Sequence, residues 1–267
     1  MRVIVVGAGI GGLTVAIALH ARGIECQVYE SVREIAPLGV GINVLPHAMA
    51  VLRELGLMER VAALGIATSE LCFFNRHGQI IWREPRGIDA GYTVAQVSLH
   101  RGRFQLELLA AAQERLGAHA IRTGVPLTAI SGGDDGALPM ATFTDRHSGQ
   151  SFTDSGDVII GADGIHSVVR RHFFPDEGPP HWSGNILWRG VTEGSPFLTG
   201  RSMFMAGHRP HKFVAYPITA PRTDGRLTIN WIAELDRTAR GLPGLDDWNK
   251  RGDFADFAPR FADAAFW

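Results

Sequence analysis

The sequence predicts an α/β fold in which a parallel sheet flanked by helices is combined with a β-rich domain. A strand, a glycine-rich turn and a helix follow one another at residues 2–20, and the same order returns at residues 157–174. Between and after these units the chain carries hairpin and strand signals. Antiparallel pairing has no place in the middle of a doubly wound sheet. We therefore expect two kinds of layer within the 267 residues.

The first unit carries a dinucleotide-binding fingerprint. The apolar strand Arg2–Val6 runs into the glycine-rich turn Gly7–Gly12 and then into an apolar helical pattern. Gly7 permits the tight turn, Gly9 lets the backbone approach a pyrophosphate, and Gly12 lets the helix pack closely on the sheet. The N-terminal N–H groups of the helix then face the anion. This pattern predicts a Rossmann-like domain.

An acidic residue follows where the fingerprint requires one. The second strand, residues 24–29, ends at Glu30, whose carboxylate can accept both hydroxyls of an adenosine ribose. A 2′-phosphate would meet negative charge at that place. The site therefore suits FAD or NAD and disfavours NADP, and the fingerprint alone leaves open which dinucleotide binds.

Composition narrows the class of protein. A net charge of −1 without a basic stripe argues against nucleic-acid binding. The apolar N-terminal run is broken at Gly7, too early for a signal sequence or a membrane span. Cys26 and Cys72 lie on apolar segments and are predicted to be buried free thiols, as in a cytoplasmic protein. The histidines show no metal-ligand spacing, so no metal site is expected.

The β-rich part is indicated by a hairpin and by later strands. Residues 70–74 and 79–82 flank the turn Asn75-Arg76-His77-Gly78. A glycine-punctuated segment at 37–43 is predicted to be a loop, and a helical segment is predicted from Asp246. Further strands of this part are predicted at 186–191, 203–205, 212–218 and 227–235, while two short strands at 120–122 and 125–130 are predicted on the nucleotide-binding side.

Four sequence blocks together resemble a known family. They are the glycine-rich turn ending in Glu30, the loop Gly39–Ile42, the helix after Arg101 and the segment Gly161–Ser167, which reads GADGIHS. The chain resembles the FAD-dependent aromatic hydroxylases, the single-component class A flavoprotein monooxygenases, over essentially its whole length. The likeness is strongest to the phenazine monooxygenases of that family, through the stretches PLGVGIN, EPRG, WRGVTE and VAYPI.

The resemblance implies an FAD-dependent monooxygenase that hydroxylates a small aromatic molecule, phenazine-carboxylate-like or salicylate-like, with O2 and with NADH or NADPH. In this family the reduced flavin adds O2 to give a C4a-hydroperoxide, and an electron-rich ring attacks its distal oxygen. The flavin carries the chemistry, so no side chain is expected to be catalytic. The protein positions the substrate and excludes water. Apolar segments such as 186–188 and 213–215 suit the walls of such a pocket.

The resemblance also assigns cofactor-binding residues. Arg101 matches a residue that contacts the phosphate or ribityl region of the flavin, and the backbone near Val125 matches the adenine site. Asp163 matches an aspartate that serves FAD binding and NAD(P)H use, while Gly41 belongs to the loop beside the isoalloxazine. The full set is Gly7, Gly9, Gly12, Glu30, Gly41, Arg101, Val125 and Asp163.

Arg189 and Tyr216 are the substrate-binding residues that the resemblance implies. Simpler roles stay open for several residues. Asp163 would also cap the short helix that follows it, and Arg101 would be an exposed arginine at a helix start. Arg189 would stack or pair locally, and Tyr216 would be a core ring with a satisfied hydroxyl.

The family pattern divides the chain into FAD-binding residues 1–74 and 98–180 and substrate-domain residues 75–97 and 181–267. A third FAD block, typically GDAAH before a long helix, follows the substrate domain in this family and is missing from the sequence. The chain is therefore expected to be truncated at its C-terminus.

Rival interpretations are an NAD-dependent dehydrogenase, a non-hydroxylating flavoprotein reductase on the same fold, and an inactive FAD-domain fragment.

Overall fold

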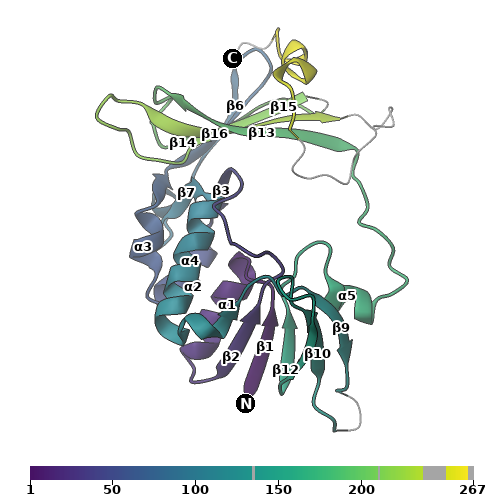
Figure 1. Cartoon of the computed structure of the whole chain (residues 1–267). Helices are drawn as coiled ribbons and strands as arrows, with labels where there is room; N and C mark the ends of the chain where they lie inside the picture. Colours follow the sequence, from purple (N-terminus) through teal and green to yellow (C-terminus); the bar gives the residue numbers. More distant parts are fainter. Residues whose placement is uncertain (134–135, 210, 237–250, 264–267) are drawn as a thin grey trace. The chain divides into compact units, whose positions relative to one another are not determined.

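The computed structural model describes residues 1–133, 136–209, 211–236 and 251–263. The chain forms two compact units, each made of two stretches of sequence (Figure 1). The first unit is Met1–Leu38 with Gly102–Pro180, and the second is Gly39–Arg101 with His181–Trp267. In the described part of the chain, no helix is long and apolar enough to cross a membrane.

A parallel sheet forms the centre of the first unit. Its strand order is β12-β1-β2-β8, and every neighbouring pair is parallel. Ile4 of β1 and Leu13 and Ile17 of α1 are fully buried, because the apolar side chains of strand and helix pack against each other. The strands are β1 (Arg2–Val6), β2 (Glu25–Tyr29), β8 (Ile121–Arg122) and β12 (Val158–Gly161). The helices of this unit are α1 (Ile10–His20), α4 (Arg101–Leu116), α5 (Val168–Phe173) and the short η2 (Ala118–Ala120).

An antiparallel meander completes the first unit. Its order is β11-β10-β9. Phe143 of β10 is fully buried and stacks on Tyr29 of β2 with ring centroids 4.1 Å apart. This contact joins the meander to the parallel sheet. The strands are β9 (Leu127–Ser131), β10 (Met140–Thr144) and β11 (Ser151–Ser155).

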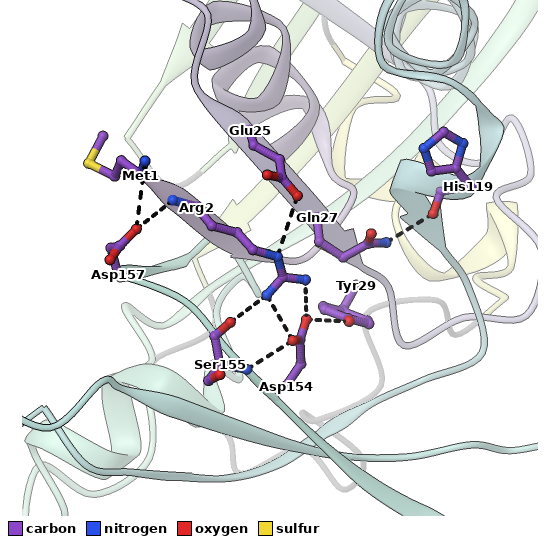
Figure 2. Close-up of polar contacts among 9 residues, drawn as sticks. All are labelled: Met1, Arg2, Glu25, Gln27, Tyr29, His119, Asp154, Ser155 and Asp157. Carbon is purple, nitrogen blue, oxygen red and sulfur yellow. Dashed lines mark hydrogen bonds and ion pairs between the residues drawn. The ribbon is translucent and has the colours of Figure 1, made fainter.

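A polar cluster ties the first strand to the meander (Figure 2). The Arg2 guanidinium donates to both carboxylate oxygens of Asp154, at 2.8 and 2.7 Å, and the Tyr29 hydroxyl donates to Asp154 Oδ2 at 2.6 Å. Burial alone would raise the pKa of Asp154, but the hydrogen bonds from Arg2 and Tyr29 outweigh it and hold that pKa below its ordinary value. Burial and the bond to Asp154 raise the pKa of Tyr29, so this hydroxyl stays a donor.

The second unit is built on a six-stranded sheet in the order β13-β16-β15-β14-β5-β6. The predicted hairpin is confirmed: β5 and β6 are antiparallel, and the Asn75 N–H donates to the Gln79 carbonyl at 3.0 Å. β14 pairs in parallel with β5, whereas the other pairs are antiparallel. The strands are β5 (Glu70–Phe74), β6 (Ile80–Pro85), β13 (Asn185–Gly194), β14 (Ser202–His208), β15 (His211–Pro217) and β16 (Leu227–Asp236).

Strand alternation gives this sheet two different faces. On one face, Phe213 and Ala215 of β15 pack with Phe257 and Phe261 near the C-terminus. On the other face Val214, Tyr216 and Ile218 form a separate cluster with Met203, Met205 and Ile232. We call the second one the Tyr216 face.

A three-stranded sheet in the order β3-β7-β4 also belongs to the second unit. The segment predicted to be a loop at 37–43 contains the start of β3, because Gly41 pairs with His100 of β7, far away in sequence. Ser98 of β7 is fully buried and hydrogen-bonded to Asn43 at 2.5 Å. The elements are β3 (Gly41–Val44), β4 (Gly65–Thr68), β7 (Gln96–His100), α2 (Pro46–Glu54), α3 (Met58–Ala62) and η1 (Gly87–Ala90).

The boundaries of the two packed units differ from the predicted boundaries between FAD-binding and substrate-domain residues. Residues 39–74 pack with the second unit, whereas the sequence analysis grouped them with the FAD-binding part. The assignment of domains by ligand stays a prediction. Of the predicted helical segment from Asp246, residues 246–250 lie outside the described residues. The short helices η3 (Phe254–Asp256) and η4 (Ala258–Arg260) follow.

Candidate functional site

The glycine-rich turn after β1 has the shape of an anion cradle. Gly7 has φ +103°, and a Cβ atom on it would lie 2.4 Å from the Ala162 carbonyl oxygen. A Cβ atom on Gly12 would lie 1.9 Å from the Gly7 carbonyl oxygen. Both positions therefore admit only glycine, for the packing reason that the fingerprint gives. They also show that the turns at Gly7 and Ala162 touch.

Gly9 occupies a different environment. It precedes α1 in an extended conformation, and no side chain of the described residues caps this helix end. A Cβ atom on Gly9 would meet no atom within 4 Å. The N-terminal N–H groups of α1 thus lack a side-chain acceptor and open onto free space. This is the environment that a pyrophosphate needs, because these groups and the helix dipole both favour an anion.

Glu30 lies directly after β2, beside this cradle. Its Oε2 accepts a hydrogen bond from the Ala8 N–H at 2.7 Å, and its Oε1 accepts from the Val32 N–H at 2.9 Å and the Ser31 hydroxyl at 3.0 Å. A carboxylate offers about four acceptor positions, so one remains for a ribose hydroxyl. The bond to Ala8 fixes the carboxylate relative to the glycine-rich turn.

Val125 and Gln105 lie near the same turn. Val125 is buried, and its N–H donates to the Glu30 carbonyl at 2.9 Å, which puts its backbone beside the predicted ribose site. Gln105 of α4 donates from Nε2 to the Ala8 carbonyl at 2.9 Å. Sequence reasoning missed Gln105. Its position one helical turn after Arg101 was the only available signal.

Asp163 caps helix α5. Its Oδ2 accepts from the N–H groups of Val168 at 2.6 Å and Val169 at 3.2 Å, and its Oδ1 accepts from the Ser167 hydroxyl at 2.5 Å. The Ser167 oxygen in turn accepts from the Arg170 N–H at 2.8 Å. The simpler capping role therefore exists in the structure, and a role of Asp163 toward FAD or NAD(P)H stays a prediction.

Arg101 and Gly41 lie in the second unit. The exposed Arg101 begins α4, its N–H donates to the Val40 carbonyl at 2.8 Å, and its side chain lies beside Gly39. The Gly41 N–H donates to Asn230 Oδ1 at 2.7 Å. A Cβ atom on Gly41 would lie 2.6 Å from Asn230 Cβ and 2.8 Å from Tyr216 Cε2, so only glycine fits.

Arg189 and Tyr216 lie on the same face of the six-stranded sheet. Arg189 pairs with Ile232, and Ile232 pairs with Val214, two residues from Tyr216. Burial raises the pKa of Tyr216 to about 12, and the positive charge of Arg189 partly offsets that rise. Tyr216 is therefore a neutral donor at physiological pH. Arg189 is exposed and forms no ion pair with any described residue.

The apolar segment 213–215, which was predicted to form a pocket wall, places its side chains on both faces of the sheet. Phe213 and Ala215 face away from Tyr216 and line a pocket of about 390 Å³ with Trp231 and Phe257. Only Val214 of that run belongs to the Tyr216 face. The prediction treated neighbouring residues of one strand as one wall, whereas successive side chains point to opposite faces.

The comparisons with known proteins agree with this fold. The model of the FAD binding domain family matches residues 1–219. The chain belongs to this family, and it is similar to FAD-dependent aromatic hydroxylases, as the sequence resemblance predicted. The α/β fold with a parallel sheet and β-rich sheets is likewise confirmed.

Two curated relatives indicate the chemistry of the family. The phenazine 1,6-dicarboxylic acid hydroxylase PhzS of Lysobacter antibioticus is 43% identical over 267 residues, which is 99% of this chain and 65% of the relative. The 3-amino-4-hydroxybenzoate 2-monooxygenase of Streptomyces cremeus is 32% identical over 233 residues, which is 84% of this chain and 55% of the relative. The chain thus spans less than two thirds of the length of these relatives.

A solved structure gives the same fold with its ligands bound. Klebsiella pneumoniae HpxO complexed with FAD and uric acid is similar with a TM-score of 0.77 and 26% sequence identity. The match covers 99% of this chain and 62% of the HpxO chain.

Proposed function

We propose that this chain is part of an FAD-dependent monooxygenase that uses NADH or NADPH and O2 to hydroxylate a small aromatic carboxylic acid. The observation that carries the proposal is the Tyr216 face, where a neutral tyrosine and an arginine without an ion pair among the described residues lie on one side of a sheet. Both curated relatives described above are named for aromatic carboxylic acids, which supports this substrate class.

The first unit fits FAD. Gly9 leaves space at the uncapped end of α1 for the pyrophosphate, and Glu30 keeps an acceptor position for the adenosine ribose. Val125 and Gln105 support the backbone around this site. When bound and reduced by NAD(P)H, FAD supplies the activation of O2, so that one oxygen atom enters the ring and the other leaves as water.

The second unit supplies the substrate side. The Arg189 guanidinium binds the substrate carboxylate through paired N–H groups. The Tyr216 hydroxyl donates to an acceptor on the substrate, because its raised pKa keeps it protonated. Val214, Met203, Met205 and Ile232 make the rest of this face apolar, which excludes water from the reacting atoms. We place the enzyme in the cytoplasm, since Cys26 and Cys72 are both buried free thiols.

The role of Arg189 is tested by pairing variants with ligands. In the intact gene product that carries this chain, the Kd is measured for phenazine-1,6-dicarboxylate and for phenazine, with the parent and with Arg189→Gln. Loss of the charge should weaken binding of the dicarboxylate by about 2 kcal/mol, or roughly 30-fold, and leave phenazine unaffected. FAD content should not change.

Arg226 offers a matched control, because it is another exposed arginine of this unit, bonded to the Glu193 carbonyl rather than placed on the Tyr216 face. Arg226→Gln should leave both affinities at the parental value. An Arg189→Gln variant that binds the dicarboxylate as tightly as the parent would show that the carboxylate is held elsewhere.

A further inference from the structure

Asn230 is a buried polar residue that belongs to no recognisable sequence motif. It lies in the middle of β16 with 0% of its surface exposed. Its Oδ1 accepts from the Gly41 N–H at 2.7 Å, whereas its Nδ2 has no hydrogen-bond partner among the described residues. Buried polar groups are nearly always paired, so an asparagine that leaves one half unpaired needs an explanation.

The bond to Gly41 fixes the orientation of the Asn230 amide. A backbone N–H can only donate, so the side-chain atom that faces Gly41 must be the oxygen. The side chain at this position must therefore supply a hydrogen-bond acceptor for the Gly41 N–H. The Nδ2 group of Asn230 forms no hydrogen bond with the described residues. The contact is also tight, because a Cβ on Gly41 would lie 2.7 Å from Asn230 Cγ.

The same contact includes Tyr216. Asn230 and Tyr216 are direct cross-strand neighbours, and a Cβ on Gly41 would lie 2.8 Å from the Tyr216 ring. One hydrogen bond thus holds the start of β3 against two adjacent strands of the six-stranded sheet. The three residues connect the loop 39–42 with the face that carries Arg189.

We propose that Asn230 is a positioning residue for hydroxylation, whose amide oxygen holds the Gly41 peptide in place beside Tyr216. This inference rests on the proposed function, in which the Tyr216 face holds the substrate, and on the family resemblance, which implies that the loop 39–42 belongs beside the flavin ring. Fixing the Gly41 peptide keeps the loop and the substrate strands in one geometry. Loosening it lets water and substrate move relative to the reacting oxygen, so that reduced flavin releases H2O2 instead of product.

The first test measures the bond itself in the ligand-free protein. Amide hydrogen exchange at Gly41 is compared in the intact gene product and in Asn230→Ala, Asn230→Asp and Ile229→Ala. Exchange should rise about tenfold in Asn230→Ala, because one hydrogen bond is lost. It should stay near the parental rate in Asn230→Asp, which keeps an acceptor oxygen. Ile229→Ala is the matched control, because it shortens the neighbouring side chain of the same strand on the face opposite Tyr216.

The second test separates positioning from a purely structural role. FAD content, substrate Kd and the ratio of H2O2 to hydroxylated product are measured on the same proteins. Asn230→Ala should keep FAD and raise the H2O2 ratio severalfold, while Ile229→Ala should not raise it and Asn230→Asp should restore coupling.

Unchanged Gly41 exchange in Asn230→Ala would overturn the proposal, and so would faster exchange with unchanged coupling. A parent protein that binds FAD and hydroxylates nothing refutes the proposed function before any variant is compared.

Discussion

Replacing Asp154 by asparagine should destabilise the protein, because this carboxylate joins β1, β2 and β11 (Figure 2). It accepts four hydrogen bonds, two from the Arg2 guanidinium, one from the Tyr29 hydroxyl and one from the Ser155 N–H. Its side chain is 20% exposed, so solvent screens these bonds only in part. Asparagine keeps one acceptor oxygen but turns an N–H2 group toward a donor.

The expected loss follows from this geometry. Hydrogen bonds to charged groups contribute about 1.5–3 kcal/mol each, and the variant loses at least one of them and creates a donor–donor contact. With a discount for partial exposure, the free energy of unfolding should fall by about 2–3 kcal/mol at neutral pH. Asp157→Asn is the control, because Asp157 is 47% exposed and the asparagine oxygen can still accept the hydrogen bond from the Arg2 N–H, so the change should cost less than about 0.5 kcal/mol.

The pH dependence provides a second readout. The folded-state pKa of Asp154 lies below its ordinary value, so the stability that its charge contributes is complete above the unfolded-state pKa of about 3.9. That contribution is lost as the pH falls through the folded-state pKa. Urea unfolding at pH 7 and at successively lower pH should therefore show the gap between parent and Asp154→Asn closing below about pH 4. An Asp154→Asn variant as stable as Asp157→Asn at pH 7 would refute this reasoning.

Three further predictions concern the cofactor side. Glu30→Gln should weaken FAD retention by about 1–3 kcal/mol in a flavin-release titration, because a charged acceptor beside the ribose is lost; equal retention would contradict the site. Gly9→Val should weaken it more, since the side chain fills the space left for the pyrophosphate, and retention above that of Glu30→Gln would argue against this placement. Asp163→Ala should lower unfolding stability by about 1 kcal/mol through the lost cap of α5. Asp163→Ala should also slow flavin reduction by NAD(P)H in stopped flow. Reduction at the parental rate would show that Asp163 only caps the helix.

Local signals predicted most elements of the fold. The strands around Gly7, the hairpin at Asn75 and the long strands of the six-stranded sheet lie within a few residues of their predicted places. Each combines an apolar run with a turn residue that ends it, and both are visible in a short window of sequence. The anion cradle was predictable for the same reason, because Gly7, Gly9 and Gly12 are fixed by contacts within one turn and its neighbour.

What the sequence could not predict depends on contacts between distant residues. β3 was taken for a loop because its strand character comes from pairing with β7, more than fifty residues later. Asn230 reaches Gly41 across 189 residues, and Arg2 reaches Asp154 across 152. Residues 213–215 were predicted to form one pocket wall, although their side chains point to opposite faces of the sheet. Burial on both faces of the strand removes the alternation of polar and apolar residues that would have shown this.

Oxygen-18 incorporation by the intact gene product decides whether the protein is a monooxygenase. The purified protein is supplied with FAD, NAD(P)H, phenazine-1,6-dicarboxylate and oxygen-18 gas, and the product is examined by mass spectrometry. We expect FAD bound to the protein and a hydroxylated product that carries one oxygen-18 atom from O2. Bound FAD and NAD(P)H oxidation without any labelled aromatic acid, across phenazine and hydroxybenzoate carboxylates, would contradict the proposed function.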